Sequence, residues 1–159
     1  MIKILMLNNE YPPLGGGTGT VNREILKHLA GNPDLEIDLV TSSADENQKV
    51  ESFSKRITIY KIPVDRFNIH HASNKELILY GWRAFRQGYK LHQKKQYDLC
   101  FAWSAVPACV SALALKSISG LPYIVRVSGP DIPGFEERYQ NLYPVLTQPS
   151  KLSGIPPRL

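Results

Sequence analysis

A glycine-rich segment, NNEYPPLGGGTGTV, runs from Asn8 to Val21 and holds the residues best suited to bind an anion. Gly15, Gly16 and Gly17 carry no side chains, so their backbone N–H groups can approach a ligand closely. The helix expected after them directs its positive end at the same place. The segment therefore predicts a loop that binds a phosphate or a sugar phosphate without a charged side chain.

The loop fits neither of the common nucleotide-binding templates. A dinucleotide fingerprint, G-x-G-x-x-G, would need glycine at the positions of Thr20 or Asn22. A P-loop would need Gly-Lys-Ser/Thr, and no lysine follows these glycines. A plain strand-to-helix turn is the alternative, although a turn does not need three glycines in a row.

Two later segments place polar residues directly after apolar strands. Ser104 follows the strand that ends near Ala102, and Ser128, Gly129 and Asp131 follow the strand that ends near 127. Ligands of open α/β sheets bind beyond the carboxyl ends of the strands, so we expect these segments and the glycine loop to line one cleft. Asp131 has a second interpretation as a turn aspartate that accepts hydrogen bonds from local N–H groups.

Short apolar runs alternate along the chain with patterns of helical spacing. We expect strands at 2–7, 35–39, 57–62, 97–102 and 123–127, helices that begin near 21, 73 and 104, and a polar loop at 45–55. Strands separated by helices favour a parallel sheet with right-handed crossovers. The sequence predicts an α/β, Rossmann-like three-layer domain with a mainly parallel sheet of about five strands. This domain covers residues 1–147, and an irregular tail covers 148–159.

Apolar residues at helical spacing suggest which face of each helix is buried. The expected buried stripes are Val21, Ile25 and Leu29 in the first helix and Val106, Cys109, Val110 and Leu113 in the last. In the long middle helix, Trp82, Phe85 and Tyr89 form one stripe, and a neighbouring stripe is basic (Arg83, Arg86, Lys90, Lys94). Such a helix can lie on an anionic membrane, but we expect the aromatic stripe to pack on the sheet.

The composition of the chain limits the classes of partner and the cellular compartment that we expect. The chain has 159 residues and a net charge of +5, which suits an anionic ligand or an anionic membrane surface. No block of Lys and Arg or RNA-binding motif indicates nucleic acid. Two cysteines without a paired framework, and no apparent signal peptide or membrane span, favour a cytoplasmic protein, with peripheral contact to the inner face of the membrane as an option.

Two stretches resemble the N-terminal half of family 4 retaining glycosyltransferases of the GT-B fold. They are KILMLNNEYPPLGGGTGTVNREILKHLA and YDLCFAWSAVPACVSALALKSISGLPYIVRVSGPDIPGF. In that family a strand leads through Tyr-Pro-Pro to a Gly-Gly pair and a helix, and a later strand ends in His-Gly-x-Asp or Arg-Gly-x-Asp. The resemblance covers about Met1 to Thr147.

The resemblance implies a hexosyl-type transfer from a nucleotide-sugar co-substrate, with retention and without a metal or another cofactor. The acceptor, a sugar, a lipid or a polysaccharide precursor, would bind the N-terminal domain, and the donor would bind mainly a C-terminal domain. The implied catalytic residues are Asp131 and Ser128. The implied substrate-binding residues are Tyr11, Gly15, Gly16, Gly17, Thr18, Ser104 and Gly129.

The chain departs from the family pattern in two respects. Ser128 stands where many members have His or Arg, and the paired glutamates of the family's donor domain are missing. We therefore expect a truncated, acceptor-side half that lacks the C-terminal domain and is inactive alone. The alternatives are a non-catalytic sugar- or nucleotide-binding module and a separate Rossmann-type nucleotide-dependent enzyme such as an oxidoreductase.

Overall fold

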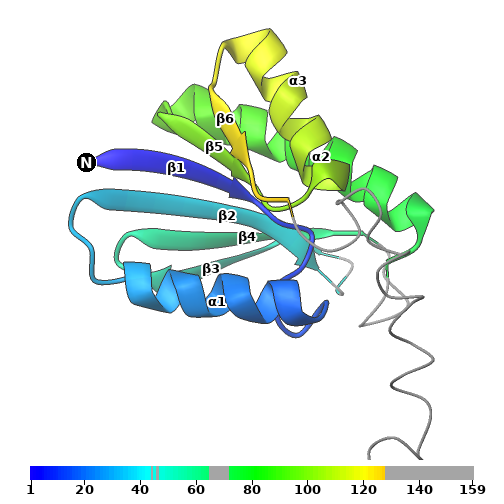
Figure 1. Ribbon diagram of the computed structural model, residues 1–159, viewed down its shortest axis with the longest axis horizontal. Coiled ribbons are helices and arrows are strands. Elements are labelled where there is room, and N and C mark those ends of the chain that lie inside the picture. Colours follow the sequence, from blue (N-terminus) through cyan, green and yellow to red (C-terminus); the bar gives the residue numbers. More distant parts are fainter. Residues whose placement is uncertain (44, 46, 65–71, 128–159) are drawn as a thin grey trace, which may run out of the picture. The chain divides into compact units, whose positions relative to one another are not determined.

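Six strands form one sheet between helices in the computed structural model, which describes residues 1–43, 45, 47–64 and 72–127 (Figure 1). The chain divides into two units, Met1–Arg126 and Val127–Leu159. All described residues except Val127 belong to the first unit.

The elements follow the predicted alternation of strands and helices. They are β1 (Ile2–Leu7), α1 (Gly17–Leu29), β2 (Leu35–Ser43), β3 (Lys49–Ser54), β4 (Ile57–Pro63), α2 (Asn74–Lys95), β5 (Leu99–Ala102), the π-helical turn η1 (Ala105–Cys109), α3 (Val110–Ser119) and β6 (Tyr123–Val125). The strand order is β3-β4-β2-β1-β5-β6, and every pair is parallel except β3 with β4. The predicted α/β, Rossmann-like class is confirmed.

The polar loop predicted for 45–55 is wrong, because Lys49–Ser54 is strand β3. β3 pairs antiparallel with β4 at the edge of the sheet, and its first four residues are exposed. An edge strand that buries so little of either face needs no apolar alternation. Hydrophobic periodicity therefore gave no signal for it.

The core lies on both faces of the sheet. Figure 1 shows α1 on one face and α2 with α3 on the other. Alternate strand residues divide accordingly. Met6, Leu26, Ile37, Leu39, Ile57, Ile59 and Trp103 pack on the α1 side, and Leu5, Leu7, Val40, Tyr80, Ala84, Cys100 and Leu115 pack on the α2–α3 side.

The buried faces of two helices differ from the predicted stripes. In α1, Asn22 and Leu26 are buried, whereas Val21 and Ile25 are 42% and 38% exposed. In α3 the exposed side includes Val110. Val106 and Leu113 are exposed as well, and the buried residues of η1 and α3 are Pro107, Ala108, Ser111, Ala112 and Leu115. Helical spacing identifies stripes of residues, and two neighbouring stripes can both look buried. Here the buried stripes contain polar and small residues, so the neighbouring exposed stripes are the more apolar ones in the sequence.

Small residues let α3 and α2 approach closely. The Ser111 hydroxyl donates to the carbonyl of Gly81 over 2.8 Å. A Cβ built at Gly88 would lie 3.1 Å from Leu5 and 3.2 Å from Leu115, so a larger residue there would push apart two layers. This contact fixes α2 over the sheet on the side away from α1.

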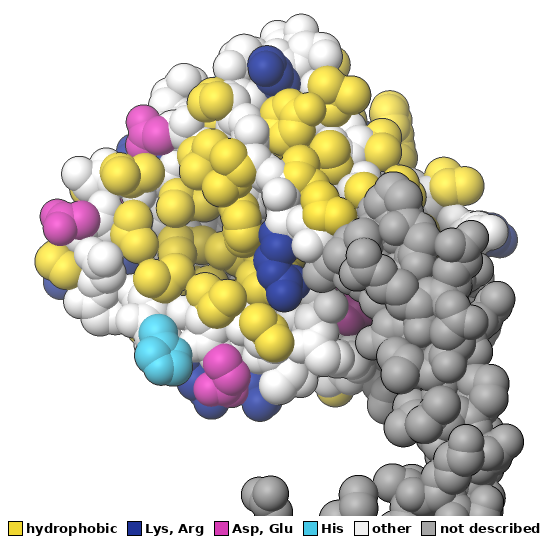
Figure 2. All heavy atoms as spheres, viewed as in Figure 1, with side chains coloured by type: hydrophobic (Ala, Val, Ile, Leu, Met, Phe, Trp, Pro, Cys, Tyr) yellow, Lys and Arg dark blue, Asp and Glu magenta, His cyan; other side chains and the backbone are white. Residues whose placement is uncertain are grey.

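The face of the sheet shared with α1 is only partly covered. Figure 2 shows apolar side chains gathered over this face. Ile2 in β1 and Ile124 in β6 are 51% and 50% exposed, and Phe101 between them is partly buried. Within the described residues, α1 is the one helix on this side.

The predicted capping box at the start of α2 is confirmed. The Ser73 hydroxyl accepts from the N–H of Glu76, and the Glu76 carboxylate accepts from the N–H of Ser73. The helix ends at Lys95, as predicted, where Gln96 adopts a left-handed conformation with φ of 56°.

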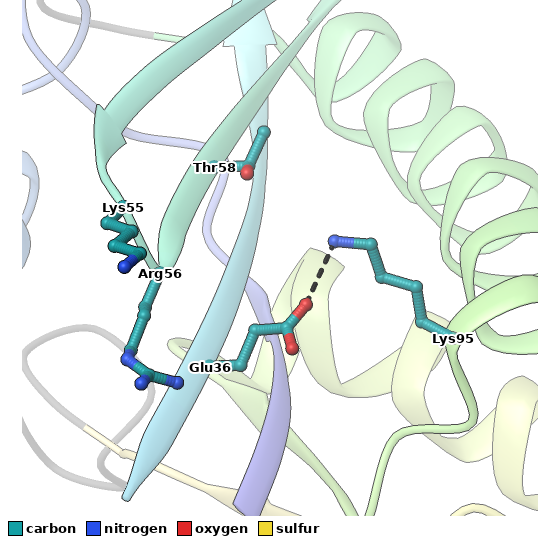
Figure 3. Close-up of a pocket in the computed structure, with 5 residues that line it drawn as sticks. All are labelled: Glu36, Lys55, Arg56, Thr58 and Lys95. Carbon is teal, nitrogen blue, oxygen red and sulfur yellow. Dashed lines mark hydrogen bonds and ion pairs between the residues drawn. The ribbon is translucent and has the colours of Figure 1, made fainter. Parts of the chain in front are cut away.

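The end of α2 joins the sheet through a buried ion cluster. The Lys95 ammonium lies 2.6 Å from the Asp38 carboxylate. It also lies 3.2 Å from the Glu36 carboxylate (Figure 3). The Tyr97 hydroxyl also donates to Asp38. Burial by itself lowers the pKa of Lys95, but the hydrogen bond and charge of Asp38, together with Glu36, outweigh it and raise the pKa above the ordinary 10.5.

Substitution Lys95→Met should destabilise the protein by about 3 kcal/mol, because it leaves a carboxylate only 1% exposed without its counter-charge. Urea unfolding measures the loss, and the exposed neighbour Lys94→Met is the control, expected to change stability by less than about 0.5 kcal/mol. A group whose pKa is raised by folding contributes its full stability at pH values below its pKa in the unfolded chain. This contribution is lost as the pH rises through its pKa in the folded protein. The difference between wild type and Lys95→Met should therefore persist at neutral pH and shrink only above pH 10.5. Equal loss in both variants would contradict this role.

Candidate functional site

The strand order reverses at β1, which lies between β2 and β5. Such a reversal opens a crevice beyond the carboxyl ends of the two central strands, where α/β proteins bind ligands. Asn8 directly follows β1, and its N–H donates to the carbonyl of Val40. Trp103 directly follows β5, and its N–H donates to the carbonyl of Leu7. Asn8 and Trp103 therefore flank the reversal.

Buried polar side chains lie on the α1 side of this edge. Met6 and Leu39 belong to the core on that face, so Asn8 and Thr41, two residues further along each strand, share it. Trp103 packs in the same core, and Asn22 is on the buried face of α1. Their exposed fractions range from 0% for Asn22 and Thr41 to 1% for Asn8 and Trp103.

These side chains keep hydrogen-bonding capacity that the described protein does not use. The atoms without a partner there are Asn8 Nδ2, both amide atoms of Asn22, Thr41 Oγ1 and Trp103 Nε1. Burying an unpaired polar group costs about 1–3 kcal/mol each, and folded proteins contain few of them. A gathering of such atoms at one edge of the sheet indicates a site where a polar ligand binds.

Aromatic rings and cations border the same edge. The Arg126 guanidinium lies 4.7 Å from the centre of the Trp103 ring, and the Lys61 ammonium lies 5.8 Å from the centre of the Tyr11 ring. Burial raises the pKa of Tyr11, and the nearby Glu51 charge adds to it, so its hydroxyl stays neutral. Amide, hydroxyl and indole groups beside aromatic rings suit the alternating polar and apolar surfaces of a sugar.

The glycine loop separates into two kinds of position. Gly15 has a φ of +90°, and Gly19 lies so close to Tyr11 and Leu14 that a Cβ would crowd them at 3.2 Å. Both glycines therefore serve the local fold. At Gly16 and Gly17 a Cβ would meet nothing within 4 Å, so this part of the loop is open to a ligand, as predicted for close approach.

A carboxylate of the chain contacts the loop. Glu10 Oε2 accepts a hydrogen bond from the N–H of Gly16 over 3.1 Å. α1 begins without a side-chain cap, and the N–H groups of a helix's first turn have no partner within the helix. Glu10 thus places a negative charge where the loop was predicted to bind an anion.

The other predicted site residues fall into two groups. Thr18 lies half-buried in the first turn of α1, and Ser104 accepts from the N–H of Ala108, which confirms it as a helix cap and commits its side chain to the fold. Ser128, Gly129 and Asp131 lie outside the described residues. The role of each in binding or catalysis stays a prediction.

Sequence reasoning missed Asn8, Asn22 and Thr41. A signal was present, because each is a polar residue next to apolar ones in a buried element: Asn8 after LML, Asn22 beside Val21, and Thr41 after LV. The glycine fingerprint considered Asn22 only as a position where glycine is missing. Arg126 follows β6, and its guanidinium lies over the Trp103 ring.

Two pockets lie apart from these polar side chains, the first at the amino edge of the sheet and the second beside the carboxyl end of β4. One, of about 290 Å³, lies at the amino ends of β2 and β4 (Figure 3); its lining consists of Glu36, Lys55, Arg56, Thr58 and Lys95. It adjoins the ion cluster that joins α2 to the sheet. The second, of about 410 Å³, lies between β4 and α2, lined by Gln48, Ile62, Pro63, Arg83, Arg86, Gln87 and Lys90.

Comparison with solved structures places the fold among known ones. Sucrose-phosphate synthase from Thermosynechococcus elongatus superposes with a TM-score of 0.62 at 15% identity, over 79% of this chain and 32% of that chain. A second structure of that synthase gives 0.58 at 12% identity, over 92% and 72%. The chain thus spans about a third of the length of the first synthase structure. No protein-family model matches the chain, and no curated protein matches it.

Substitution Asn22→Leu should raise the free energy of unfolding by about 1 kcal/mol, because an apolar side chain of similar shape replaces a buried amide without partners. Urea unfolding measures the change. Val21→Leu, on the exposed side of the same turn, is the control and should alter stability by less than about 0.5 kcal/mol. A clear loss of stability in Asn22→Leu would mean that the amide has partners in the folded protein, against this description of the site.

Proposed function

We propose that the chain is the acceptor-side domain of a glycosyltransferase, which binds a sugar or sugar-phosphate group beyond the carboxyl edge of its sheet. The acceptor lies against Asn8, Asn22, Thr41 and Trp103. The sugar comes from a nucleotide-sugar donor with retention of configuration. In this proposal the donor is bound mainly by a second domain, and the described residues supply the acceptor side of the site.

The gathering of unpaired buried polar atoms at the strand reversal carries this proposal. The hydroxyls of a sugar ring both donate and accept hydrogen bonds, as the amide of Asn22 does. A purely anionic ligand only accepts, so it would leave the amide oxygen without a partner. The indole N–H of Trp103, which has no partner among the described residues, offers a further donor at the same edge. The fold likeness to sucrose-phosphate synthase, an enzyme named for a phosphorylated disaccharide, supports the same class of substrate.

The open part of the glycine loop supports binding of the donor's phosphates. Gly16 and Gly17 leave room for an anion at the start of α1, where N–H groups and the helix dipole favour negative charge. When the bond to the transferred sugar breaks, negative charge grows on the leaving diphosphate, and oriented N–H groups stabilise it. Asp131 and Ser128 are the proposed catalytic residues, as the family resemblance implies.

The fluorescence of Trp103 can be used to measure sugar binding. The sequence has two tryptophans, so Trp82→Phe leaves Trp103 as the single emitter. In that background, hexoses or hexose phosphates should change the Trp103 emission in a saturable way. Adding Asn22→Leu should weaken this binding roughly tenfold, the loss of about 1.4 kcal/mol of hydrogen bonding.

Three outcomes would contradict the proposal. Binding of NAD rather than a sugar would favour the oxidoreductase alternative. Absence of any sugar response would remove the acceptor site, and full turnover of a nucleotide sugar by this chain alone would remove the need for a second domain. Val21→Leu is the matched control and should bind sugar as the background protein does.

Substitution Glu10→Gln should raise the affinity of the loop for an anion, because the carboxylate now at the Gly16 N–H competes with it. Isothermal titration with inorganic pyrophosphate and with uridine, guanosine and adenosine diphosphates measures the change. We expect tighter binding by roughly two- to fivefold, the range of charge effects at an exposed helix start. Glu24→Gln removes the same charge from α1 farther along and is the control. Equal affinities in both variants would mean that Glu10 does not occupy an anion site.

A further inference from the structure

Two rings of the aromatic stripe of α2, Trp82 and Tyr89, lie on its outer face, contrary to the prediction that the stripe packs on the sheet, whereas Phe85 packs partly against the core. Ile78 is 74% exposed, Trp82 58% and Tyr89 37%. The residues that pack inward are instead Tyr80, Ala84, Gly88 and Leu91. Scattered exposed apolar residues are normal, but these recur at helical spacing on one side of one helix.

The exposed residues form a connected strip. Phe85, partly buried, lies between the other two rings, 6.0 Å from Trp82 and 6.3 Å from Tyr89 between ring centres. Ile78 is one turn before Trp82 on the same side. We name this set, Ile78, Trp82, Phe85 and Tyr89, the aromatic strip. Trp and Tyr are the side chains most enriched where water meets lipid headgroups.

Cations border the aromatic strip on the side toward β4. Arg83, Arg86 and Lys90 line the pocket of about 410 Å³ beside Pro63, whose carbonyl accepts from Arg83 over 2.5 Å. No carboxylate of the described residues forms an ion pair with these three cations. The one acidic residue of α2, Glu76, is buried in the capping box. This surface thus carries positive charge that the described protein leaves unneutralised.

We propose that this face of α2 binds the surface of an anionic membrane. The aromatic strip enters the interfacial region, and the headgroup phosphate of an anionic lipid binds at the pocket of Arg83, Arg86 and Lys90. Among the described residues, no helix is long and apolar enough to cross a bilayer. Charge complementarity selects lipid over an apolar protein partner, because an apolar groove would gain nothing from three uncompensated cations. The site is on the opposite face of the sheet from α1 and does not depend on the proposed sugar transfer.

Sedimentation of the 159-residue chain with vesicles tests the proposal. Vesicles containing phosphatidylglycerol should bind it, and pure phosphatidylcholine vesicles should bind it at least tenfold more weakly. Added salt should weaken binding, because surface charges are screened within about 10 Å at 0.1 M. The Trp82 emission should shift to shorter wavelength on binding, and Trp82→Phe should remove the shift, since Trp103 is only 1% exposed.

Two paired variants separate the charged and the apolar contributions. Arg86→Gln with Lys90→Gln should weaken binding roughly 25-fold, at about fivefold for each cation. Its control, Lys27→Gln with Lys55→Gln, removes the same charge from other exposed positions and should have little effect. Ile78→Ser with Trp82→Ser should weaken binding at least tenfold, whereas Val50→Ser, 61% exposed on β3, should not. Circular dichroism verifies that each variant is folded.

Several results would overturn the proposal. They are equal binding to both kinds of vesicle, equal effects of the variants and their controls, and no vesicle binding at all. Saturable binding of free glycerol phosphate to Arg83, Arg86 and Lys90 without vesicle binding would make the pocket a soluble-anion site instead, and would also reject the membrane contact.

Discussion

Parallel pairing of β1 with both β2 and β5 is the constraint on which the rest of the structure depends. Parallel neighbours cannot be joined by a hairpin, so each connection crosses a face of the sheet, and right-handed crossovers place α1 on one face and α2 with α3 on the other. The chain leaves β1 toward β2 and later returns on the other side through β5. The carboxyl ends of both neighbours therefore open beside Asn8, and the glycine loop follows directly from the same strand.

Buried polar groups are paired to different extents in the two halves of the sheet. One oxygen of the Asp38 carboxylate is paired with Lys95 and Tyr97, and this cluster ties α2 to β2, although the other oxygen, Oδ1, has no partner among the described residues. Toward the carboxyl edge, Asn22 and Thr41 are equally buried, and their amide and hydroxyl groups have no partner at all among the described residues. A fold gains nothing from unpaired buried amides, whereas a binding site needs them free. The amide of Asn22 and the hydroxyl of Thr41 are therefore the groups on which the proposed acceptor site depends.

The sequence predicted the parts of the fold that local signals specify. The apolar run of β1 and the capping box at Ser73 lead to the observed elements, because burial on both faces and a reciprocal cap are visible in a few residues. It failed where a distant partner decides the outcome. Lys49–Ser54 is a strand because β4 lies beside it, and Asn22 rather than Val21 faces inward because of how α1 lies on the sheet. The glycine loop was located correctly for the same local reason, but its contact with Glu10 required the folded geometry.

In α2, the hydrophobicity of the side chains alone does not predict which face of the helix is buried. Its inner side is chosen by size: Gly81 and Gly88 allow close contact with α3 and β1, where an aromatic ring would not fit. The rings of Trp82 and Tyr89 are then left on the outer side, although hydrophobicity alone would bury them. Exposure of a tryptophan ring to water is unfavourable, so a surface that covers Trp82 would stabilise the protein. The surface of an anionic membrane provides an apolar layer for the aromatic rings and negatively charged headgroups for the neighbouring cations.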